Sequence, residues 1–117
     1  AFSEDGCIWN RKGQVCIDFK DNSENAIARP FVYKEDNIWK MIYSFKGKAY
    51  RLGYAESLDG IVWERKDGLI KFTKNRHNFD SQMMEYAIVV KTNGKKYLFY
   101  NGNNYGYDGI GVAVSYD

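Results

Sequence analysis

Cysteine and histidine are frequent metal ligands and nucleophiles in proteins, and this chain has three such residues, Cys7, Cys16 and His77. The two cysteines are the only ones present, and they lack the Cys-x-x-Cys spacing of zinc and redox sites. His77 lies in a polar stretch without a second histidine or cysteine at ligand spacing. The spacing therefore predicts no metal and no cofactor. We expect small, free thiols in the core, although a disulfide stays open, and a solvated loop histidine.

The composition excludes several classes of function. The net charge of +2 comes from 17 basic and 15 acidic residues, which is too even for an electrostatic nucleic-acid binder. No apolar run approaches the ~20 residues that cross a bilayer, and no charged-then-apolar leader opens the sequence. We therefore expect a cytoplasmic protein whose partners include neither nucleic acid nor a membrane. One Pro, 11 Gly and 17% aromatic residues favour strands joined by tight turns.

An internal repeat organises the chain. The segment SEDGCIWNRK at residues 3–12 recurs as SLDGIVWERK at residues 57–66, and a third copy begins as AVSYD at residues 113–117. Further matches fall between these anchors in the same order: MIYS at 41–44 with LFYN at 98–101, and LGYA at 52–55 with IGVA at 110–113. One match could arise by chance, but several in the same order indicate a structural repeat.

Each repeat contains short stretches rich in β-branched and aromatic residues, which favour strands. The expected strands are residues 29–33, 38–44, 50–57 and 61–65 in the first repeat, and 85–91, 96–101 and 109–115 in the second. Asp59-Gly60 and Asn93-Gly94 have the sequence of tight hairpin turns. No segment keeps a helical apolar period long enough to predict an α-helix.

Four antiparallel strands in a repeat of about 40–50 residues are typical of a β-propeller blade. We predict an all-β fold in which residues 1–117 form a single propeller segment. Residues 1–13 would be the outer strand of a closing blade, residues 26–68 a first blade, and residues 82–117 a second. Because propellers use about 4–8 blades, further chain or a homo-oligomer must complete the ring. Three chains with six blades are the count we expect for an assembly.

Several motifs of the chain resemble one family. They are RP at 29–30, WKMIYS at 39–44, YRLGYAES at 50–57, FDSQM at 79–83, YNGN at 100–103 and GIG at 109–111, with Trp63 and Ala113. Together they resemble the five-bladed β-propeller glycosidases of the arabinanase/xylosidase and fructosidase-like superfamily, and uncharacterised glycosidase-like propellers. Those proteins are far longer, so the chain resembles only their last two blades.

The resemblance implies a chemistry. In that superfamily, carboxylates at the inner ends of strands act as general acid and as base or nucleophile in glycoside hydrolysis. Glu85, at the start of an inner strand, and Asp80 are the catalytic candidates that it implies. Two departures stand against hydrolysis: Pro30 follows Arg29 without an intervening Asp, and Gln82 replaces an expected Glu. A Gln cannot be a general acid, but Arg29 and Gln82 remain candidates for substrate binding.

Other candidates for substrate binding lie where loops follow inner strands, at the expected rim of a funnel. They are Tyr43, Tyr100, Asn101, Asn103, Tyr105 and Tyr107. Trp9 and Trp63 recur at one repeat position, which favours packing between blades over sugar stacking. Structural alternatives stay open for Arg29, which can bind a neighbouring blade, and for Asp80, which can cap a turn.

Three functions fit these observations. The first is a carbohydrate-binding, glycosidase-like propeller, and whether it hydrolyses its ligand is left open by the sequence. The second is a non-catalytic, lectin-like assembly of two-blade chains. The third is a structural interaction module without a small ligand.

Overall fold

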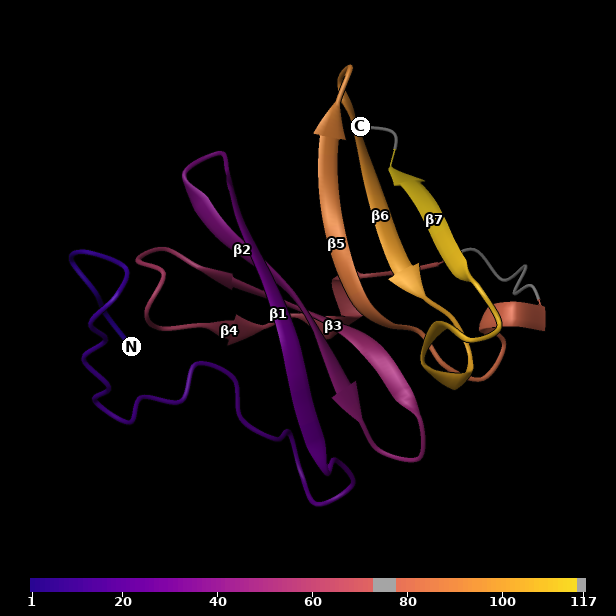
Figure 1. Ribbon diagram of the computed structural model, residues 1–117, viewed down its shortest axis with the longest axis horizontal. Helices are drawn as coiled ribbons and strands as arrows, with labels where there is room; N and C mark the ends of the chain where they lie inside the picture. The colour runs from indigo at the N-terminus through magenta and orange to yellow at the C-terminus, as the bar shows by residue number, and fades with distance from the viewer. Residues whose placement is uncertain (73–77, 116–117) are drawn as a thin grey trace.

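The computed structural model describes residues 1–72 and 78–115, so His77 lies outside the described residues. The chain forms two antiparallel sheets that lie side by side (Figure 1). The first contains β1 (Ala26–Glu35), β2 (Ile38–Lys46), β3 (Tyr50–Ser57) and β4 (Glu64–Arg65); the second contains β5 (Glu85–Thr92), β6 (Lys95–Asn101) and β7 (Ile110–Ser115). Each strand pairs with the next one along the chain. The predicted all-β fold is confirmed.

Three short 3-10 helices lie outside the sheets: η1 (Asp67–Leu69), η2 (Asn78–Asp80) and η3 (Asn104–Gly106). In the part of the chain that the structure describes, no helix has the length and apolar character needed to cross a membrane.

The innermost strands of the two sheets share an irregularity. The pairing of β1 with β2 shifts between Ala28 and Phe31, and that of β5 with β6 shifts between Glu85 and Ile88. Arg29 and Tyr86 lie within these two bulges, with φ of 52° and 55°. Such left-handed backbone is uncommon outside glycine, and bulges redirect the side chains that they carry. Equivalent bulges therefore set the direction of Arg29 and Tyr86.

The turn after β3 is longer than the tight hairpin and the strand over 61–65 that the sequence predicts. The Asp59 carboxylate accepts hydrogen bonds from the backbone amides of Ile61 and Val62 at 2.8 and 2.9 Å. The Trp63 indole donates to the Gly60 carbonyl at 3.1 Å. Because these bonds hold residues 60–63 in the turn, these residues do not pair with β3, and β4 contains only Glu64–Arg65.

The same turn recurs near the N-terminus. Asp5 accepts hydrogen bonds from the backbone amides two and three residues on, at 2.8 and 2.9 Å, and Trp9 donates to the Gly6 carbonyl at 3.1 Å. The sequence repeat is thus also a repeat of hydrogen bonds. Around this turn, Phe2 and Asn10 form an isolated β-bridge. The assignment of residues 1–13 to the outer strand of a closing blade stays a prediction.

The expectation that the two cysteines are core thiols is wrong. Cys7 and Cys16 are free and exposed. Both lie in the N-terminal segment, residues 1–25, which runs along one side of the first sheet (Figure 1) and contains no strand.

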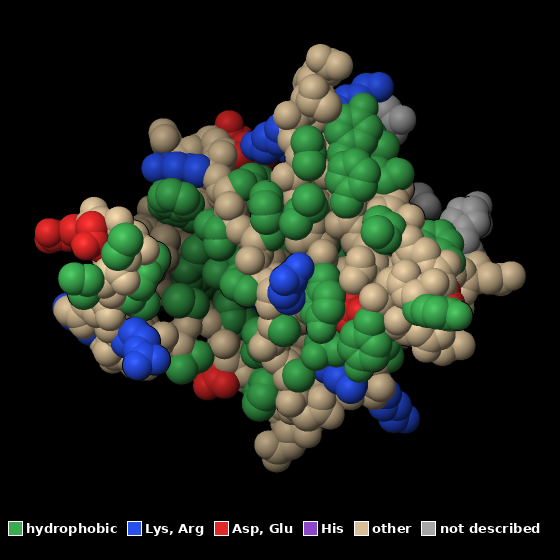
Figure 2. Space-filling model, viewed as in Figure 1, with side chains coloured by type: hydrophobic (Ala, Val, Ile, Leu, Met, Phe, Trp, Pro, Cys, Tyr) green, Lys and Arg blue, Asp and Glu red, His purple; other side chains and the backbone are tan. Residues whose placement is uncertain are grey.

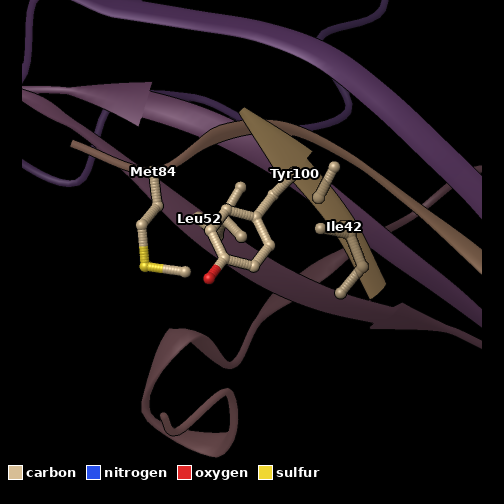
Figure 3. Packing of buried hydrophobic residues seen from close by; sticks show 5 residues of the cluster. Ile42, Leu52, Met84 and Tyr100 are labelled. Carbon is tan, nitrogen blue, oxygen red and sulfur yellow. The ribbon is translucent and has the colours of Figure 1, made fainter. Parts of the chain in front are cut away.

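The main core fills the space between the sheets. Ile42 and Leu52 from the first sheet meet Ala87 and Tyr100 from the second, together with Met84, which immediately precedes β5 (Figure 3). A second cluster lies on the other face of the first sheet and is formed by Met41, Tyr43 and Ala55, with Ile17 and Trp63 packed against it. Trp63 therefore packs within the first sheet, whereas Trp9 is exposed, and the packing of these two rings between blades stays a prediction.

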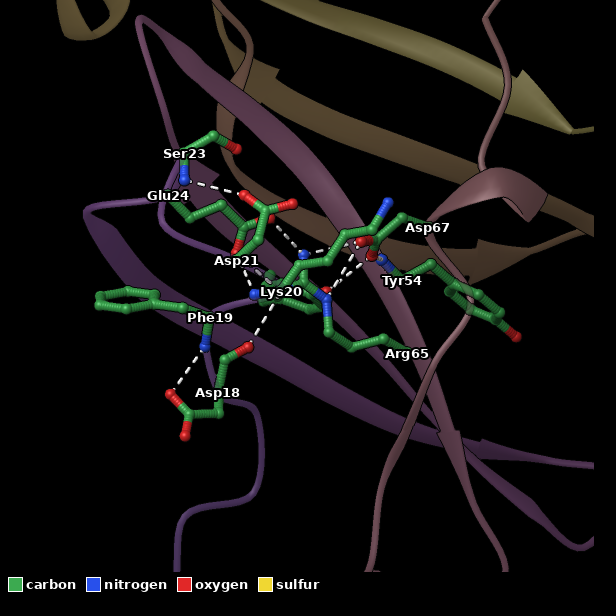
Figure 4. Close-up of polar contacts among 10 residues, drawn as sticks. Asp18, Phe19, Lys20, Asp21, Ser23, Glu24, Tyr54, Arg65 and Asp67 are labelled. Carbon is green, nitrogen blue, oxygen red and sulfur yellow. Dashed lines mark hydrogen bonds and ion pairs between the residues drawn. The ribbon is translucent and has the colours of Figure 1, made fainter.

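A salt-bridge network ties the N-terminal segment to the first sheet (Figure 4). Arg65 donates to both carboxylate oxygens of Glu24, at 2.8 and 2.9 Å, and to Asp67 at 2.7 Å. Asp67 in turn accepts a hydrogen bond of 2.6 Å from the Tyr43 hydroxyl. The hydrogen bonds from Arg65 lower the pKa of Glu24. This network fixes β4 and η1 against the chain that precedes β1.

The second sheet leaves one apolar face uncovered. Ile88, Phe99 and Val112 are neighbours across β5, β6 and β7, and all three are exposed. Hydrophobic side chains gather over the β5 and β6 end of the molecule in Figure 2. By register, Phe99 and Val112 correspond to Ile42 and Tyr54, which pack on the second sheet. The uncovered face therefore has the position of a blade-packing face.

Candidate functional site

Glu85 is the most unusual ionisable residue of the described chain. Its exposed fraction is 0%, and neither carboxylate oxygen has a hydrogen-bond partner among residues 1–72 and 78–115. Burial raises the pKa of Glu85, and the nearby positive charge of Lys46 opposes that rise. A buried carboxylate without a partner is strongly disfavoured in its ionised form. The geometry therefore favours a protonated, neutral Glu85.

The local structure explains the position of Glu85. It begins β5 opposite Asn101 of β6, immediately before the bulge. The backbone amide of Tyr86 donates a hydrogen bond of 2.8 Å to the hydroxyl of Ser44, which is fully buried on β2. This bond fixes the start of β5 against the first sheet and carries Glu85 into the inner end of the fold.

A row of three tyrosines borders Glu85. The rings of Tyr86 and Tyr50 lie 5.8 Å apart, and those of Tyr50 and Tyr105 lie 6.0 Å apart and meet edge-on. Burial raises the pKa of Tyr86, and the neighbouring Glu85, Tyr50 and Tyr105 raise it further. Tyr105 is the most accessible of the three rings, with an exposed fraction of 54%.

Two cations rest on this row. The Arg29 guanidinium carbon lies 5.3 Å from the centre of the Tyr86 ring, and Lys46 Nζ lies 5.4 Å from that of Tyr50. We call this group the inner-end site. Its residues are Arg29, Lys46, Tyr50, Glu85, Tyr86 and Tyr105.

Asp80, the second predicted carboxyl, lies in η2 and is buried. One of its carboxylate oxygens accepts a hydrogen bond of 2.8 Å from the Tyr100 hydroxyl. Burial, followed by this bond, raises the pKa of Tyr100 to about 12. The carboxyl of Glu85 has no hydrogen bond to any described residue, so the two carboxyl groups are not joined to each other.

Asn103, in the loop after β6, contacts the chain around Gln82 that precedes β5. Asn103 is buried, and its side-chain oxygen accepts hydrogen bonds from the backbone amides of Gln82 and Met83 at 2.9 and 3.0 Å. Its amide group donates to the Asn78 carbonyl at 2.8 Å. These bonds join η2 to the loop after β6. The Gln82 carbonyl accepts a hydrogen bond from Arg51, and Gln82 itself is exposed.

The remaining predicted residues are distributed between core and surface. Tyr43 is buried, and its hydroxyl is bound to Asp67. Asn101 donates a hydrogen bond of 3.3 Å to the Tyr105 carbonyl, which anchors the loop that carries Tyr105. Tyr107 is almost fully exposed.

The structure thus brings Arg29, Glu85 and Tyr105 of the predicted residues into one site, and adds Lys46, Tyr50 and Tyr86. A signal for Tyr86 exists in the sequence, because the repeat aligns it with Arg29. Among the described residues, no group of three or more His, Cys, Asp or Glu side chains is placed to hold a metal ion.

Comparisons with known proteins extend these observations. No family model matches the chain. It is 34% identical over 116 residues to the uncharacterized protein Rv1502 of Mycobacterium tuberculosis, covering 97% of this chain and 38% of that protein. A proposed glycoside hydrolase of Bacteroides ovatus has a TM-score of 0.65 and 27% identity, over 78% of this chain and 28% of its own.

A second solved structure agrees in fold at lower identity. A family 117 glycoside hydrolase of Zobellia galactanivorans has a TM-score of 0.58 and 18% identity, over 88% of this chain and 38% of its own. The chain thus spans roughly a third of the length of these relatives. Its fold resembles that of propeller-type glycoside hydrolases, as the sequence motifs predict.

Proposed function

We propose that this chain is a carbohydrate-binding part of a glycoside hydrolase of propeller fold, and that Glu85 is its general acid. The observation that supports the proposal is the buried, unpartnered carboxyl of Glu85 at the inner end of the sheets. The solved structures of similar fold described as glycoside hydrolases supply the reaction class.

The chemistry follows from the protonation of Glu85. Cleavage of a glycosidic bond requires a proton on the leaving oxygen, and burial raises the pKa of Glu85, which favours the protonated form that a general acid needs. Substrate would approach past the exposed ring of Tyr105, and the tyrosine row offers apolar ring surface to a sugar.

The reaction also needs a second carboxylate as base or nucleophile. Asp80 is the candidate within this chain, but its carboxylate is bound to Tyr100 in the core. We propose that the second carboxylate comes from another blade, either in the longer polypeptide or in another copy of the chain. In this proposal residues 26–68 and 82–117 are two blades of the complete ring, and residues 1–13 contribute an outer strand.

Leaving-group dependence tests the acid role of Glu85. In the full-length protein, Glu85→Gln should lower kcat by about 10²–10⁴-fold on glycosides with poor leaving groups and spare aryl glycosides that depart without a proton. Asp80→Asn, measured in parallel, tests the alternative carboxylate. The matched control is Glu64→Gln, because Glu64 is a mostly exposed glutamate on β4.

Two outcomes would contradict the proposal. If Glu85→Gln turned over these glycosides as fast as Glu64→Gln does, Glu85 would not be the general acid. Failure of the protein to bind any member of a glycan array, or to cleave any chromogenic glycoside, would remove the hydrolase. Binding without cleavage would favour the lectin-like function, for which the Gln82 substitution is the supporting observation.

A further inference from the structure

Arg29 and Lys46 rest on neighbouring aromatic rings of one site. Five basic residues form ion pairs with Glu or Asp: Lys40, Arg65, Lys66, Lys91 and Lys96. Arg29 and Lys46, in contrast, have no carboxylate within ion-pair distance among the residues that the structure describes; they contact the rings of Tyr86 and Tyr50 instead. Two positive charges are thus left uncompensated at the inner end of the fold.

We infer that the inner-end site binds an anionic, carboxylate-bearing sugar, with Arg29 and Lys46 as the groups that receive its charge. This inference rests on the proposed function and deepens it by naming the class of substrate. The planar guanidinium of Arg29 matches the geometry of a carboxylate, and Lys46 supplies a second point charge across the tyrosine row.

The aromatic residues favour a sugar over a small free anion. Tyr86 and Tyr50 hold the two cations apart, and Tyr105 continues the row toward solvent. A ring-shaped ligand with apolar C–H faces can contact these side chains while its carboxylate reaches a cation. A free inorganic anion would use only the cations.

Glu85 is compatible with such a ligand because of its burial. An ionised carboxylate beside the two cations would neutralise part of their charge and repel an anionic sugar. Glu85 is fully buried without a hydrogen-bond partner among the described residues, which favours its neutral form.

A pair of probes that differ only in charge tests the inference. The protein should bind an oligogalacturonate at least tenfold more tightly than the fully methyl-esterified form of the same oligomer, by isothermal titration calorimetry. Arg29→Gln and Lys46→Gln should each weaken binding of the acid form by about 10- to 100-fold and leave binding of the ester unchanged. Arg29→Lys should restore part of the affinity, since it keeps the charge and loses the planar fork.

Lys34→Gln is the matched control, because Lys34 also rests on an aromatic ring, that of Trp39, but outside the inner-end site. Far-UV circular dichroism checks that each variant is folded. Equal affinity for acid and ester, or equal losses in the control, would overturn the inference while the hydrolase proposal stood. Equal binding of oligo(dT) would also overturn it, by showing a site for any polyanion. If the protein neither hydrolysed any glycoside nor bound any sugar, the proposed function itself would be contradicted.

Discussion

The buried carboxyl of Glu85 lowers the stability of the fold and at the same time supplies the proton that the proposed site needs. Its carboxyl is ionised in the unfolded chain near neutral pH but is driven toward the neutral form when buried. The folded protein therefore binds a proton more tightly at Glu85 than the unfolded protein does. This difference destabilises the fold once the pH exceeds the ordinary pKa of a glutamate.

Glu85→Gln should accordingly raise the free energy of unfolding at pH 7, by about 1–3 kcal/mol, because an amide has no charge to desolvate. The gain should shrink as the pH falls and disappear below the ordinary pKa of 4.5, where both states of the wild type are protonated. Urea unfolding at pH 4 and pH 7 measures both values. A loss of stability at pH 7 would show that Glu85 has a stabilising partner, and Glu64→Gln should change neither value.

At the scale of the elements, one carboxylate links the two sheets. Glu35, at the end of β1, forms ion pairs with Lys40 of the first sheet and with Lys91 and Lys96 of the second, at 2.6, 2.6 and 3.3 Å. Hydrogen bonds from Lys40 and Lys91 lower the pKa of Glu35 to about 2. The turns at the outer ends of β1 and β5 are therefore held together by charge as well as by the core.

This link predicts an acid-sensitive contact between the sheets. Glu35 has its lowered pKa only in the folded state, so its contribution is complete above pH 4.5 and is lost as the pH falls toward 2. Glu35→Gln should cost about 1 kcal/mol at pH 7, an amount limited by solvent screening, and should flatten the stability profile between pH 4.5 and 2. Thermal unfolding across this range provides the measurement. An unchanged profile in the variant would assign the acid sensitivity to another carboxylate.

The internal repeat explains why the positions of most strands can be predicted from the sequence. Strand periodicity and repeat matching predict β1–β3 and β5–β7 within a few residues, because each strand pairs with its sequence neighbour. The turn at Asp59-Gly60 is not predictable from this dipeptide alone, since its length depends on hydrogen bonds made by the side chains of Asp59 and Trp63.

The residues of the inner-end site are harder to predict from the sequence than the strands. Repeat alignment puts Glu85 at the start of an inner strand, and its burial follows from that position. Lys46 and Tyr50 could not be found this way, because they meet Tyr86 only when the two sheets pack together. Tyr43 and Tyr100 were predicted at a rim, but their rings are buried and lie against Gly53 and Gly111, where a Cβ atom would fall 2.4 Å from a ring carbon.

At the scale of the whole molecule, the exposed apolar face of the second sheet bears on whether the isolated chain self-associates. Phe99 and Val112 occupy positions whose counterparts in the first sheet, Ile42 and Tyr54, pack against the second sheet. An uncovered blade face of this kind is a site for a further blade.

We therefore expect the 13.6 kDa chain to self-associate in solution when it is made alone. Val112→Lys should shift the population toward the monomer, because it puts a charge in the middle of the exposed face. Val15→Lys is the control, since Val15 is an exposed valine of the N-terminal segment. Sedimentation velocity measures the masses. A wild-type monomer at all concentrations would contradict a role for this face in assembly.

The pairing of each strand with its sequence neighbour has a consequence for folding kinetics. Such hairpins begin at short loops, so each one can start to form at small loop-closure cost. The turns at residues 3–9 and 57–63 are more local still, because their hydrogen bonds span three residues at most. Each sheet can therefore form before it meets its neighbour. We expect the two sheets to dock after they form, and this docking brings Arg29 onto Tyr86 and assembles the site.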